Sequence, residues 1–313
     1  MNIQTCEFVS PKHPDKMCDY IADSILDAYL ASDPHARVAV EVMGGHGAIT
    51  VSGEVTSAYD IDLTKVIESI IGPGFQIVLR LSKQSPEIAR GVNGGGAGDQ
   101  GIMVGYATAE TENHMPHVYN LARDLCRAVY AQYPYDGKTQ VTIEDGEITT
   151  VVTSFQNAKT EELAGLVRSK IQAREYLINP GGEWSLGGFD ADSGLTGRKL
   201  VVDSYGPNIP LGGGSFSGKD YTKVDRSGAY MARKIAVGDL RKRRAKEVLV
   251  KLAYAIGKPD PVMAVAVIDG KEDAIVGYDV TPRRIADQLG LQRPIYAATA
   301  EWGHFGNQFP WDT

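Results

Sequence analysis

The 313-residue chain predicts an α+β fold made of three similar units. The first observation is a pattern that occurs three times, in which a helix precedes a strand, a turn, a second strand and another helix. The second is the spacing between copies, which at roughly 100 residues is the size of a small domain. The third is a pair of glycine-rich connectors that separate the copies. Because a helix follows each hairpin, we expect mixed sheets with helices on one face.

The first copy begins at a helix whose start and buried side are both marked in the sequence. Pro14 suits the first helical position, because its missing N–H needs no partner there. Ile21, Ile25 and Leu26 form an apolar stripe at helical spacing. The elements expected to follow are strands over 37–43 and 48–56 joined by a Gly-Gly-His-Gly turn, a helix over 61–71 and a strand over 77–81.

The second and third copies repeat this order. Asp145-Gly146 is a hairpin signal, and Thr160 with Glu162 suits a helix start. For the second copy we expect a helix over 115–133, strands over 139–144 and 147–155, and a helix over 160–173. For the third we expect helical segments between 225 and 246, strands over 247–256 and 262–268, and a helix over 281–289. The expected domains are residues 1–87, 95–183 and 184–313.

Composition narrows the class of protein. The hydrophobic content of 43% and charged content of 23% are ordinary for a soluble globular protein. The net charge of −7 argues against a nucleic-acid partner, and we interpret the basic run 241–244 as a solvated helix face. No apolar stretch is long enough for a membrane partner, and the N-terminus shows no signal-peptide pattern. The three cysteines form no CxxC pair, so we expect a cytoplasmic protein in a reducing compartment.

The candidate ligand site centres on one glycine-rich stretch. It reads Gly212-Gly213-Gly214-Ser215-Phe216-Ser217-Gly218-Lys219-Asp220 and is continued by Lys223, Asp225 and Arg226. Glycines allow a backbone to approach a ligand closely. Backbone N–H groups, hydroxyls and cationic side chains bind polyphosphate, and aspartates could hold a hard cation against the same phosphates. The alternative is an ordinary flexible surface loop.

Other acidic residues lie where a cation could use them. Asp15 falls in the first turn of a helix, where the helix dipole alone favours a carboxylate. Asp15, Asp19 and Asp23 share one helix face at i, i+4 spacing, which is mildly repulsive. A solvated face tolerates this repulsion, and a divalent cation would relieve it at Asp15. Glu41 and Glu54 interrupt apolar strands, so they either face solvent on the open side of a sheet or need a cation.

Several motifs together resemble the signatures of the S-adenosylmethionine synthetases, also called methionine adenosyltransferases. The motifs are His-Pro-Asp-Lys (13–16), Gly-Ala-Gly-Asp-Gln-Gly (96–101), Gly-Leu-Thr-Gly-Arg-Lys (194–199), the glycine-rich stretch (212–220), Lys-Val-Asp-Arg-Ser (223–227), Gly-His-Phe-Gly (303–306) and Phe-Pro-Trp (309–311). They occur in the family's order along nearly the whole chain, which resembles a compact member. The resemblance implies three βαβ-type domains related by pseudo-threefold symmetry. It also implies a homodimer or dimer of dimers with active sites between subunits.

The same resemblance implies synthesis of S-adenosylmethionine from ATP and L-methionine. The methionine sulfur attacks C5′ of ATP and displaces tripolyphosphate, which is cleaved to pyrophosphate and phosphate. A thioether carries no proton, so such a site depends on fixed cations more than on a general base. The implied cofactors are Mg²⁺, two per site, and K⁺.

Residue roles follow from the positions that match the family's motifs. The residues implied to be catalytic are His13, Lys138, Arg198 and Lys219. Those implied to bind ATP are His13, Asp136, Lys138, Trp184, Ser185, Asp192, Arg198, Lys199, Ser215 and Lys219. Those implied to bind methionine are Glu54, Gln84, Asp99, Asp192 and Lys223. Asp15 and Asp225 would each hold Mg²⁺, and Glu41 would hold K⁺. Core packing is the alternative role for Trp184.

The chain departs from the family between Gln84 and Gly98, where typical members carry a longer mobile loop over the active site. We expect a more open site here. Two rival functions stay open from the residues alone. One is a non-catalytic nucleotide-binding module, which would be expected to have lost some of the metal-binding acids or phosphate-binding cations. The other is a kinase or ligase that releases ADP or AMP.

Overall fold

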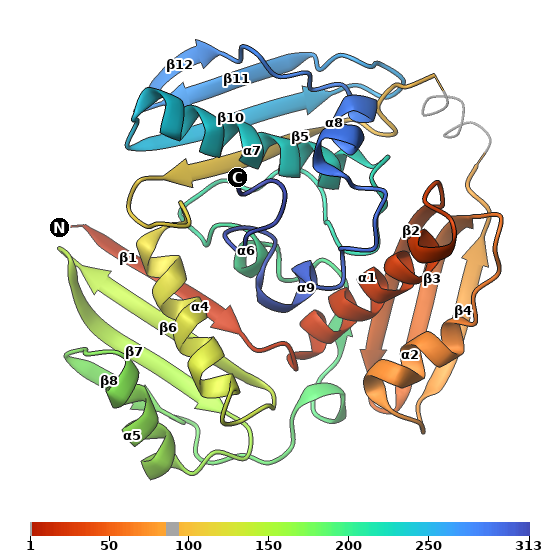
Figure 1. Ribbon diagram of the computed structural model, residues 1–313. Coiled ribbons are helices and arrows are strands. Elements are labelled where there is room, and N and C mark those ends of the chain that lie inside the picture. Colours follow the sequence, from red (N-terminus) through yellow and green to blue (C-terminus); the bar gives the residue numbers. More distant parts are fainter. Residues whose placement is uncertain (1, 86–93) are drawn as a thin grey trace.

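The computed structural model describes residues 2–85 and 94–313, and its strands form three four-stranded sheets around a common centre (Figure 1). The N-terminal sheet has the order β4 (Gln76–Ser82), β3 (Ala48–Thr56), β2 (Arg37–Gly45), β9 (Gly194–Leu195). The central sheet has the order β1 (Ile3–Val9), β6 (Gly137–Glu144), β7 (Glu147–Phe155), β8 (Glu175–Ile178). The C-terminal sheet has the order β12 (Lys271–Ala274), β11 (Met263–Ile268), β10 (Glu247–Tyr254), β5 (Gly101–Thr108).

Each sheet borrows one strand from the unit that precedes it. The strand that comes before the first long helix of a unit pairs with the hairpin of the next unit: β1 with β6, β5 with β10 and β9 with β2, all antiparallel. The exchange closes into a cycle, because the third unit donates its strand to the first. The units therefore interlock through main-chain hydrogen bonds, and the sequence boundaries expected for the domains remain a prediction.

One long helix covers each sheet on a single face. These helices are α1 (Pro14–Ser32) on the N-terminal sheet, α4 (His117–Tyr130) on the central sheet and α7 (Val224–Arg243) on the C-terminal sheet (Figure 1). The shorter helices within residues 2–85 and 94–313 are α2 (Leu63–Ile71), α5 (Thr160–Lys170), α6 (Leu200–Asp203), α8 (Pro282–Leu289) and α9 (Thr299–Trp302), with a 3₁₀ turn at Gly188–Asp190. The predicted stripe of Ile21, Ile25 and Leu26 is fully buried, so apolar spacing did identify the packed side of α1.

The three-unit α+β prediction is confirmed, and the predicted hairpins lie where they were expected. Two sheets are mixed, since β4 runs parallel to β3 and β8 parallel to β7, whereas the C-terminal sheet is antiparallel throughout its described strands. The sequence did not predict β1, β5, β8, β9 or β12. The predicted helix over 160–173 was too long at its end, because α5 stops at Lys170.

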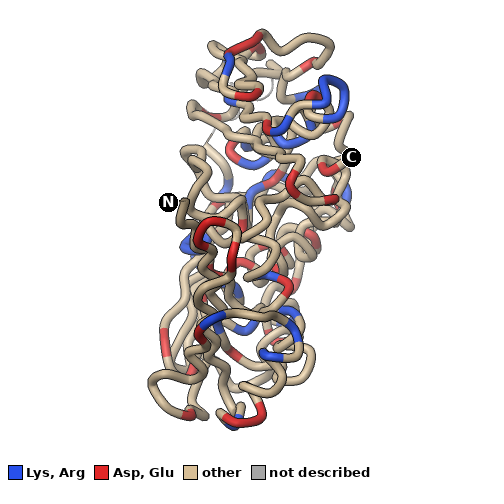
Figure 2. The backbone as a smooth tube through the Cα atoms, turned by 90° about the vertical axis from the view of Figure 1, so that its left-hand side faces the viewer, with Lys and Arg blue, Asp and Glu red and all other residues tan. Residues whose placement is uncertain are grey.

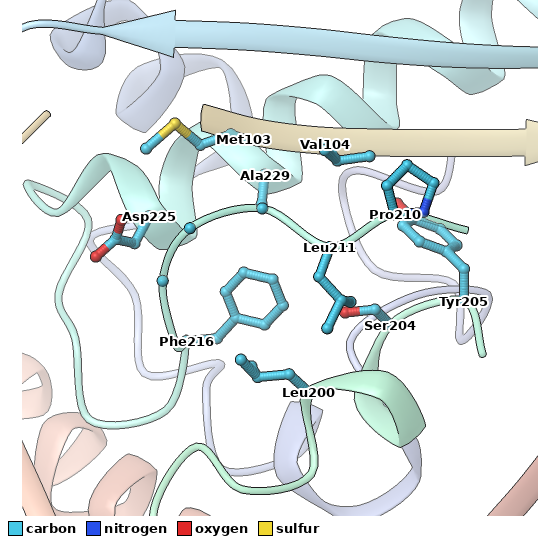
Figure 3. A pocket seen from close by; sticks show the side chains of 13 residues that line it. Met103, Val104, Leu200, Ser204, Tyr205, Pro210, Leu211, Phe216, Asp225 and Ala229 are labelled. Carbon is cyan, nitrogen blue, oxygen red and sulfur yellow. The ribbon is translucent and has the colours of Figure 1, made fainter. Parts of the chain in front are cut away.

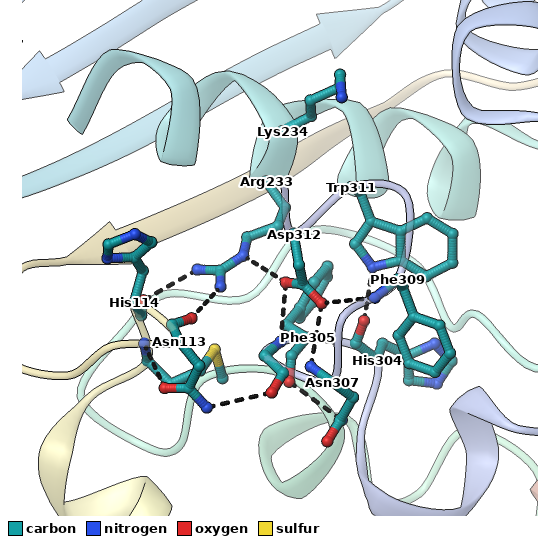
Figure 4. A network of polar contacts seen from close by, with 12 residues as sticks. Asn113, His114, Arg233, Lys234, His304, Phe305, Asn307, Phe309, Trp311 and Asp312 are labelled. Carbon is teal, nitrogen blue, oxygen red and sulfur yellow. Dashed lines mark hydrogen bonds and ion pairs between the residues drawn. The ribbon is translucent and has the colours of Figure 1, made fainter. Parts of the chain in front are cut away.

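The C-terminal tail fills the space between the sheets and is held by one buried arginine. Arg233 of α7 is fully buried and donates to the carbonyl oxygens of Asn113 (2.7 Å) and His114 (3.0 Å) and to Asp312 Oδ1 (3.0 Å) (Figure 4). Trp311 of the tail stacks on Tyr230 of α7, with ring centroids 3.7 Å apart. The tail thereby ties α7 to the segment in front of α4.

The molecule is flattened, as the two perpendicular views show (Figures 1 and 2). Figure 2 shows basic and acidic segments interspersed along the chain on the visible side. The basic run 241–244 is exposed, and Arg243 forms an ion pair of 2.5 Å with Asp273, which agrees with a solvated helix face. Among the described residues, none of the helices is long and apolar enough to cross a membrane.

Candidate active site

Two site segments line the same edge of the N-terminal sheet. In the middle of β2, the Thr196 N–H donates to the Val42 carbonyl oxygen (3.0 Å). Two residues earlier on the same strand, the Val40 N–H donates to the Gly218 carbonyl oxygen (3.1 Å). A single strand therefore places the segment 194–199 beside the glycine-rich loop 212–220, although both are distant from β2 in the sequence.

The first group of site residues surrounds the N-terminus of α1. Asp15 Oδ1 accepts the Leu195 N–H (2.9 Å) and lies 3.6 Å from Arg198 Nε, while Asp15 Oδ2 accepts a hydrogen bond from Lys199 Nζ (2.5 Å). His13 caps the helix, since its Nδ1 accepts the Asp15 N–H (3.2 Å). The predicted His-Pro-Asp-Lys and Gly-Arg-Lys motifs thus meet at one carboxylate.

Electrostatics keep the His13 ring neutral. Burial lowers the pKa of His13 to about 3, and the positive charges of Lys199 and Lys138 add to this effect. The carboxylates of Asp15 and Asp192 oppose it, so all four charges lie near the ring. Burial raises the pKa of Asp15, but hydrogen bonds from Lys199 and the backbone outweigh it and hold that pKa below its ordinary value. A neutral imidazole beside an ionised carboxylate is the result.

The second group lies on the glycine-rich loop and the start of α7. Lys219 Nζ is 2.6 Å from Asp225 Oδ2. Gly214 passes directly over this carboxylate, and a Cβ at Gly214 would overlap it. Figure 3 shows the loop bending around the Phe216 ring, with Asp225 beyond it. Ser215 packs against Gly197, where a Cβ would lie 2.7 Å from its Cβ, so the two groups adjoin at this point.

A third group lies at the end of the central sheet nearest α1. Burial raises the pKa of Asp136, whose N–H donates to Gln156 Oε1 (3.3 Å). Gln156 Nε2 in turn donates to the Ser185 carbonyl oxygen (2.8 Å). Trp184 is half-buried, with its indole N–H bonded to Ser154 Oγ (3.0 Å), so part of the ring remains accessible. Gln156 was not predicted as a site residue, and no motif marked it.

The residues expected to contact methionine are more dispersed. Lys223 is ion-paired with Asp220, while Gln84 Oε1 lies 3.4 Å from an Arg37 nitrogen. Glu54 is exposed on the open face of the N-terminal sheet. Asp99 is also exposed, and its Oδ1 accepts the N–H of the next residue. Most of the shortened segment after Gln84, residues 86–93, lies outside the described part of the chain.

The predicted metal ligands suit a hard cation bound through a substrate. Across residues 2–85 and 94–313, no three His, Cys, Asp or Glu side chains converge in the geometry of a metal site. Asp15 and Asp225 instead each present one carboxylate that a lysine now neutralises. Mg²⁺ is commonly held by one or two carboxylates together with phosphate oxygens and water, so the residues fit that ion. Glu41 is exposed, as expected for an acid on the open side of a sheet.

Of the two alternatives for the aspartates of α1, a solvated face is excluded by their burial. The side chains of Asp19 and Asp23 are buried, as is that of Asp15. Two buried cations replace water as their partners: Lys16, which lies between Asp19 and Asp203, and Arg226, which is paired with Asp23 (2.6 Å). The i, i+4 spacing was visible in the sequence, but Arg226 is 203 residues from Asp23, and Asp203, which shares Lys16 with Asp19, is 187 residues from that lysine.

Fold and site together define a class, a three-unit α+β enzyme whose cation-rich loops suit a polyphosphate. Comparison with known proteins identifies the family. Family models for the N-terminal, central and C-terminal domains of S-adenosylmethionine synthetase match residues 1–85, 94–184 and 186–313. The chain therefore belongs to the S-adenosylmethionine synthetase family.

Curated relatives match over nearly their whole length. An S-adenosylmethionine synthase of Deinococcus radiodurans is 38% identical over 384 aligned residues, covering 98% of this chain and 94% of that protein. One of Thermus thermophilus is 39% identical over 378, covering 100% and 96%, and one of Clostridium tetani is 39% identical over 375, covering 99% and 96%. Each aligned region is longer than this 313-residue chain, so the relatives carry insertions that it lacks.

Proposed function

We propose that the protein synthesises S-adenosylmethionine from ATP and L-methionine by attack of the methionine sulfur on C5′ of ATP. The proposal depends most on one observation, that each of two aspartates, Asp15 and Asp225, is paired with a lysine and that the two lysines lie on neighbouring segments along β2. The full-length match to S-adenosylmethionine synthases supports it. The leaving tripolyphosphate is then cleaved to pyrophosphate and phosphate.

The residues at the site are suited to stabilising a leaving group. Breaking the C5′–O bond places negative charge on the phosphate chain, and fixed cations stabilise such charge most when they are already in place. Lys138, Arg198, Lys199 and Lys219 supply those cations. Neutral His13 adds no charge and lies where it could bind an oxygen at the breaking bond. Trp184 and Asp136 would hold the nucleoside, with Ser185, Asp192 and Ser215 around it.

The cofactors we assign are Mg²⁺ and K⁺. Mg²⁺, when bound, neutralises phosphate oxygens and orients the chain. Asp15 and Asp225 would hold one such ion each, and binding would release Lys199 and Lys219 from them toward the phosphates. Glu41, near the Lys219 ammonium, would hold K⁺.

We assign a homodimer, or a dimer of dimers, with active sites between subunits. The open face of the N-terminal sheet supports this, because Met43 and Leu195 pair on it and are 56% and 39% exposed beside Glu41. Glu54 lies on the same face. A partner covering this face would bring its own cations toward the residues assigned to bind the substrate methionine, which are Glu54, Gln84, Asp99, Asp192 and Lys223.

One assay tests the reaction. The protein is incubated with ATP, methionine, Mg²⁺ and K⁺, and the products are identified by mass. We expect S-adenosylmethionine with pyrophosphate and phosphate in equal amounts. Release of ADP or AMP would instead indicate a kinase or ligase, and ATP binding without turnover would indicate a non-catalytic module.

A further inference from the structure

Four aspartates spaced four residues apart on α1 each accept backbone N–H groups from elsewhere in the chain. The pairs are Asp15 with Leu195 (2.9 Å), Asp19 with Gly197 (2.9 Å), Asp23 with Gly218 (2.8 Å), and Asp27 with Tyr296 (3.0 Å) and Ala297 (2.8 Å). Since an α-helix rises 1.5 Å per residue, successive carboxylates lie about 6 Å apart along one face. We call this row the aspartate ladder.

Asp19 and Asp23, the two middle members of the ladder, each bind a glycine with the same backbone conformation. Gly197 and Gly218 both have left-handed backbones, with φ of +80° and +79°, and each donates its N–H to the ladder. The residue after Gly197 is Arg198 and the residue after Gly218 is Lys219. Each phosphate-binding cation segment therefore begins at a glycine that α1 holds in place.

The arrangement is not explained by stability alone. Asp19 is 1% exposed and Asp23 0%, and like charges four residues apart on a helix repel one another. Buried ion pairs such as that of Asp23 with Arg226 contribute little net stability compared with apolar packing. What a carboxylate adds is a strong acceptor with a defined direction for an N–H donor.

Resting on the function proposed above, we propose that Asp19 and Asp23 are positioning residues that set where Arg198, Lys199 and Lys219 meet the phosphate chain. Both side chains are buried. They act through the glycine N–H groups, so that α1 fixes both cation segments on one rigid element. Asp27 belongs to the same ladder but holds Tyr296 and Ala297, which carry no site residue.

The test compares Asp19→Ala with the matched control Asp27→Ala. Both variants remove a ladder carboxylate, but only the first releases a cation segment. A displacement of about 1 Å at a reacting group can cost about 100-fold in rate, so kcat/KM for ATP should fall about 10- to 100-fold in Asp19→Ala. KM for methionine should be unchanged, and Asp27→Ala should keep wild-type kinetic constants.

Hydrogen exchange supplies a second readout that does not depend on turnover. The peptide covering residues 194–200 should exchange faster in Asp19→Ala than in the wild type, and at the wild-type rate in Asp27→Ala. Matching kinetic constants and matching exchange in the two variants would overturn the proposal. Should Asp19→Ala not fold, Asp19→Asn, which keeps an acceptor oxygen, allows the same comparison with a smaller expected effect.

The ladder and the proposed reaction can fail separately. If the wild type forms no S-adenosylmethionine, the reaction is wrong, but calorimetric titration with ATP still tests the ladder. In that case weaker ATP binding by Asp19→Ala than by Asp27→Ala supports positioning of the phosphate cations. Equal ATP affinities in the two variants would rule it out.

Discussion

At the scale of single residues, two of the site's lysines form ion pairs with aspartates. Lys199 with Asp15 and Lys219 with Asp225 are close pairs at 2.5 and 2.6 Å, in which the aspartate is buried and the lysine side chain is 15% and 18% exposed. Desolvation of both charges offsets much of the attraction within a buried pair, so such pairs are weak evidence of a stabilising role. Each pair instead keeps a lysine and an aspartate close together. A phosphate oxygen could then replace the aspartate as the partner of the lysine, and a metal ion could replace the lysine as the partner of the aspartate.

Asp225→Asn tests this role. Loss of one preorganised charge should lower kcat by about 100-fold while the fold is kept. Asp239→Asn is a suitable control, because Asp239 is a buried aspartate on the same helix, α7, about 21 Å farther along its axis. The measurement is the steady-state rate of each variant at saturating Mg²⁺. Near-normal turnover by Asp225→Asn would remove Asp225 from the metal site.

His304 is a buried group whose charge state affects stability. Burial lowers the pKa of His304 well below its ordinary value, and Arg226 and Lys16 lower it further. Its Nδ1 is 2.7 Å from the hydroxyl of Tyr230. Below about pH 6.5 the unfolded chain takes up a proton here that the folded chain does not, so stability falls as the pH falls.

The variant His304→Gln should remove this pH dependence. Between pH 7 and 5.5 the wild type should lose about 1 kcal/mol more unfolding free energy than the variant. Denaturant unfolding at the two pH values measures the difference. The comparison cancels the contributions of other groups, His13 among them, because both proteins share them. Equal losses in the two proteins would mean that His304 is protonated in the folded state.

At the scale of elements, strand β2 aligns both cation segments, and glycine permits the close approach. Gly218 has φ of +79°, and a Cβ there would overlap the Val40 carbonyl oxygen. Gly47, in the hairpin turn of the same sheet, also has φ of +79° but has open space around its Cβ position. The two glycines therefore differ in crowding and not in backbone conformation.

Gly218→Ala and Gly47→Ala form a matched pair. Both alanines should lose roughly 1 kcal/mol through the left-handed backbone, and Gly218→Ala should lose at least about 1 kcal/mol more through overpacking. Displacement of Lys219 should also lower kcat in Gly218→Ala only. Unfolding and activity are measured on both. Equal stability losses would show that the loop can move away from β2 without strain.

The sequence predicted local elements better than long-range ones. Long helices and hairpins carry their own signals, such as the stripe of α1 and the Asp145-Gly146 turn, and these were found. Strands β1, β5 and β9 were missed because their partners are non-local, and β9 has only two residues. Motifs located the candidate site segments, but the burial of Asp19 and Asp23 depends on segments that only the folded chain brings together.

At the scale of the whole molecule, the strand exchange joins three units into one structure. β1 begins the first unit, but its deletion would expose the edge of β6 in the central sheet. The candidate site residues are distributed in the same way. One group, with Lys138 and Arg198, surrounds the start of α1, and the other, with Lys219, lies on the glycine-rich loop. In a twofold-symmetric dimer, one subunit's first group can face the other's second group.

Subunit mixing tests whether the sites are shared. If each site takes Lys138 from one subunit and Lys219 from the other, a mixed dimer of Lys138→Ala and Lys219→Ala chains has one intact site and one doubly altered site. Random re-association makes half of the dimers mixed, so activity should recover to roughly a quarter of the wild-type value. As a control, Lys138→Ala mixed with Arg198→Ala should recover nothing, because both changes lie in the same group. Recovery in neither mixture, together with full activity of a monomer by light scattering, would place the complete site within one chain.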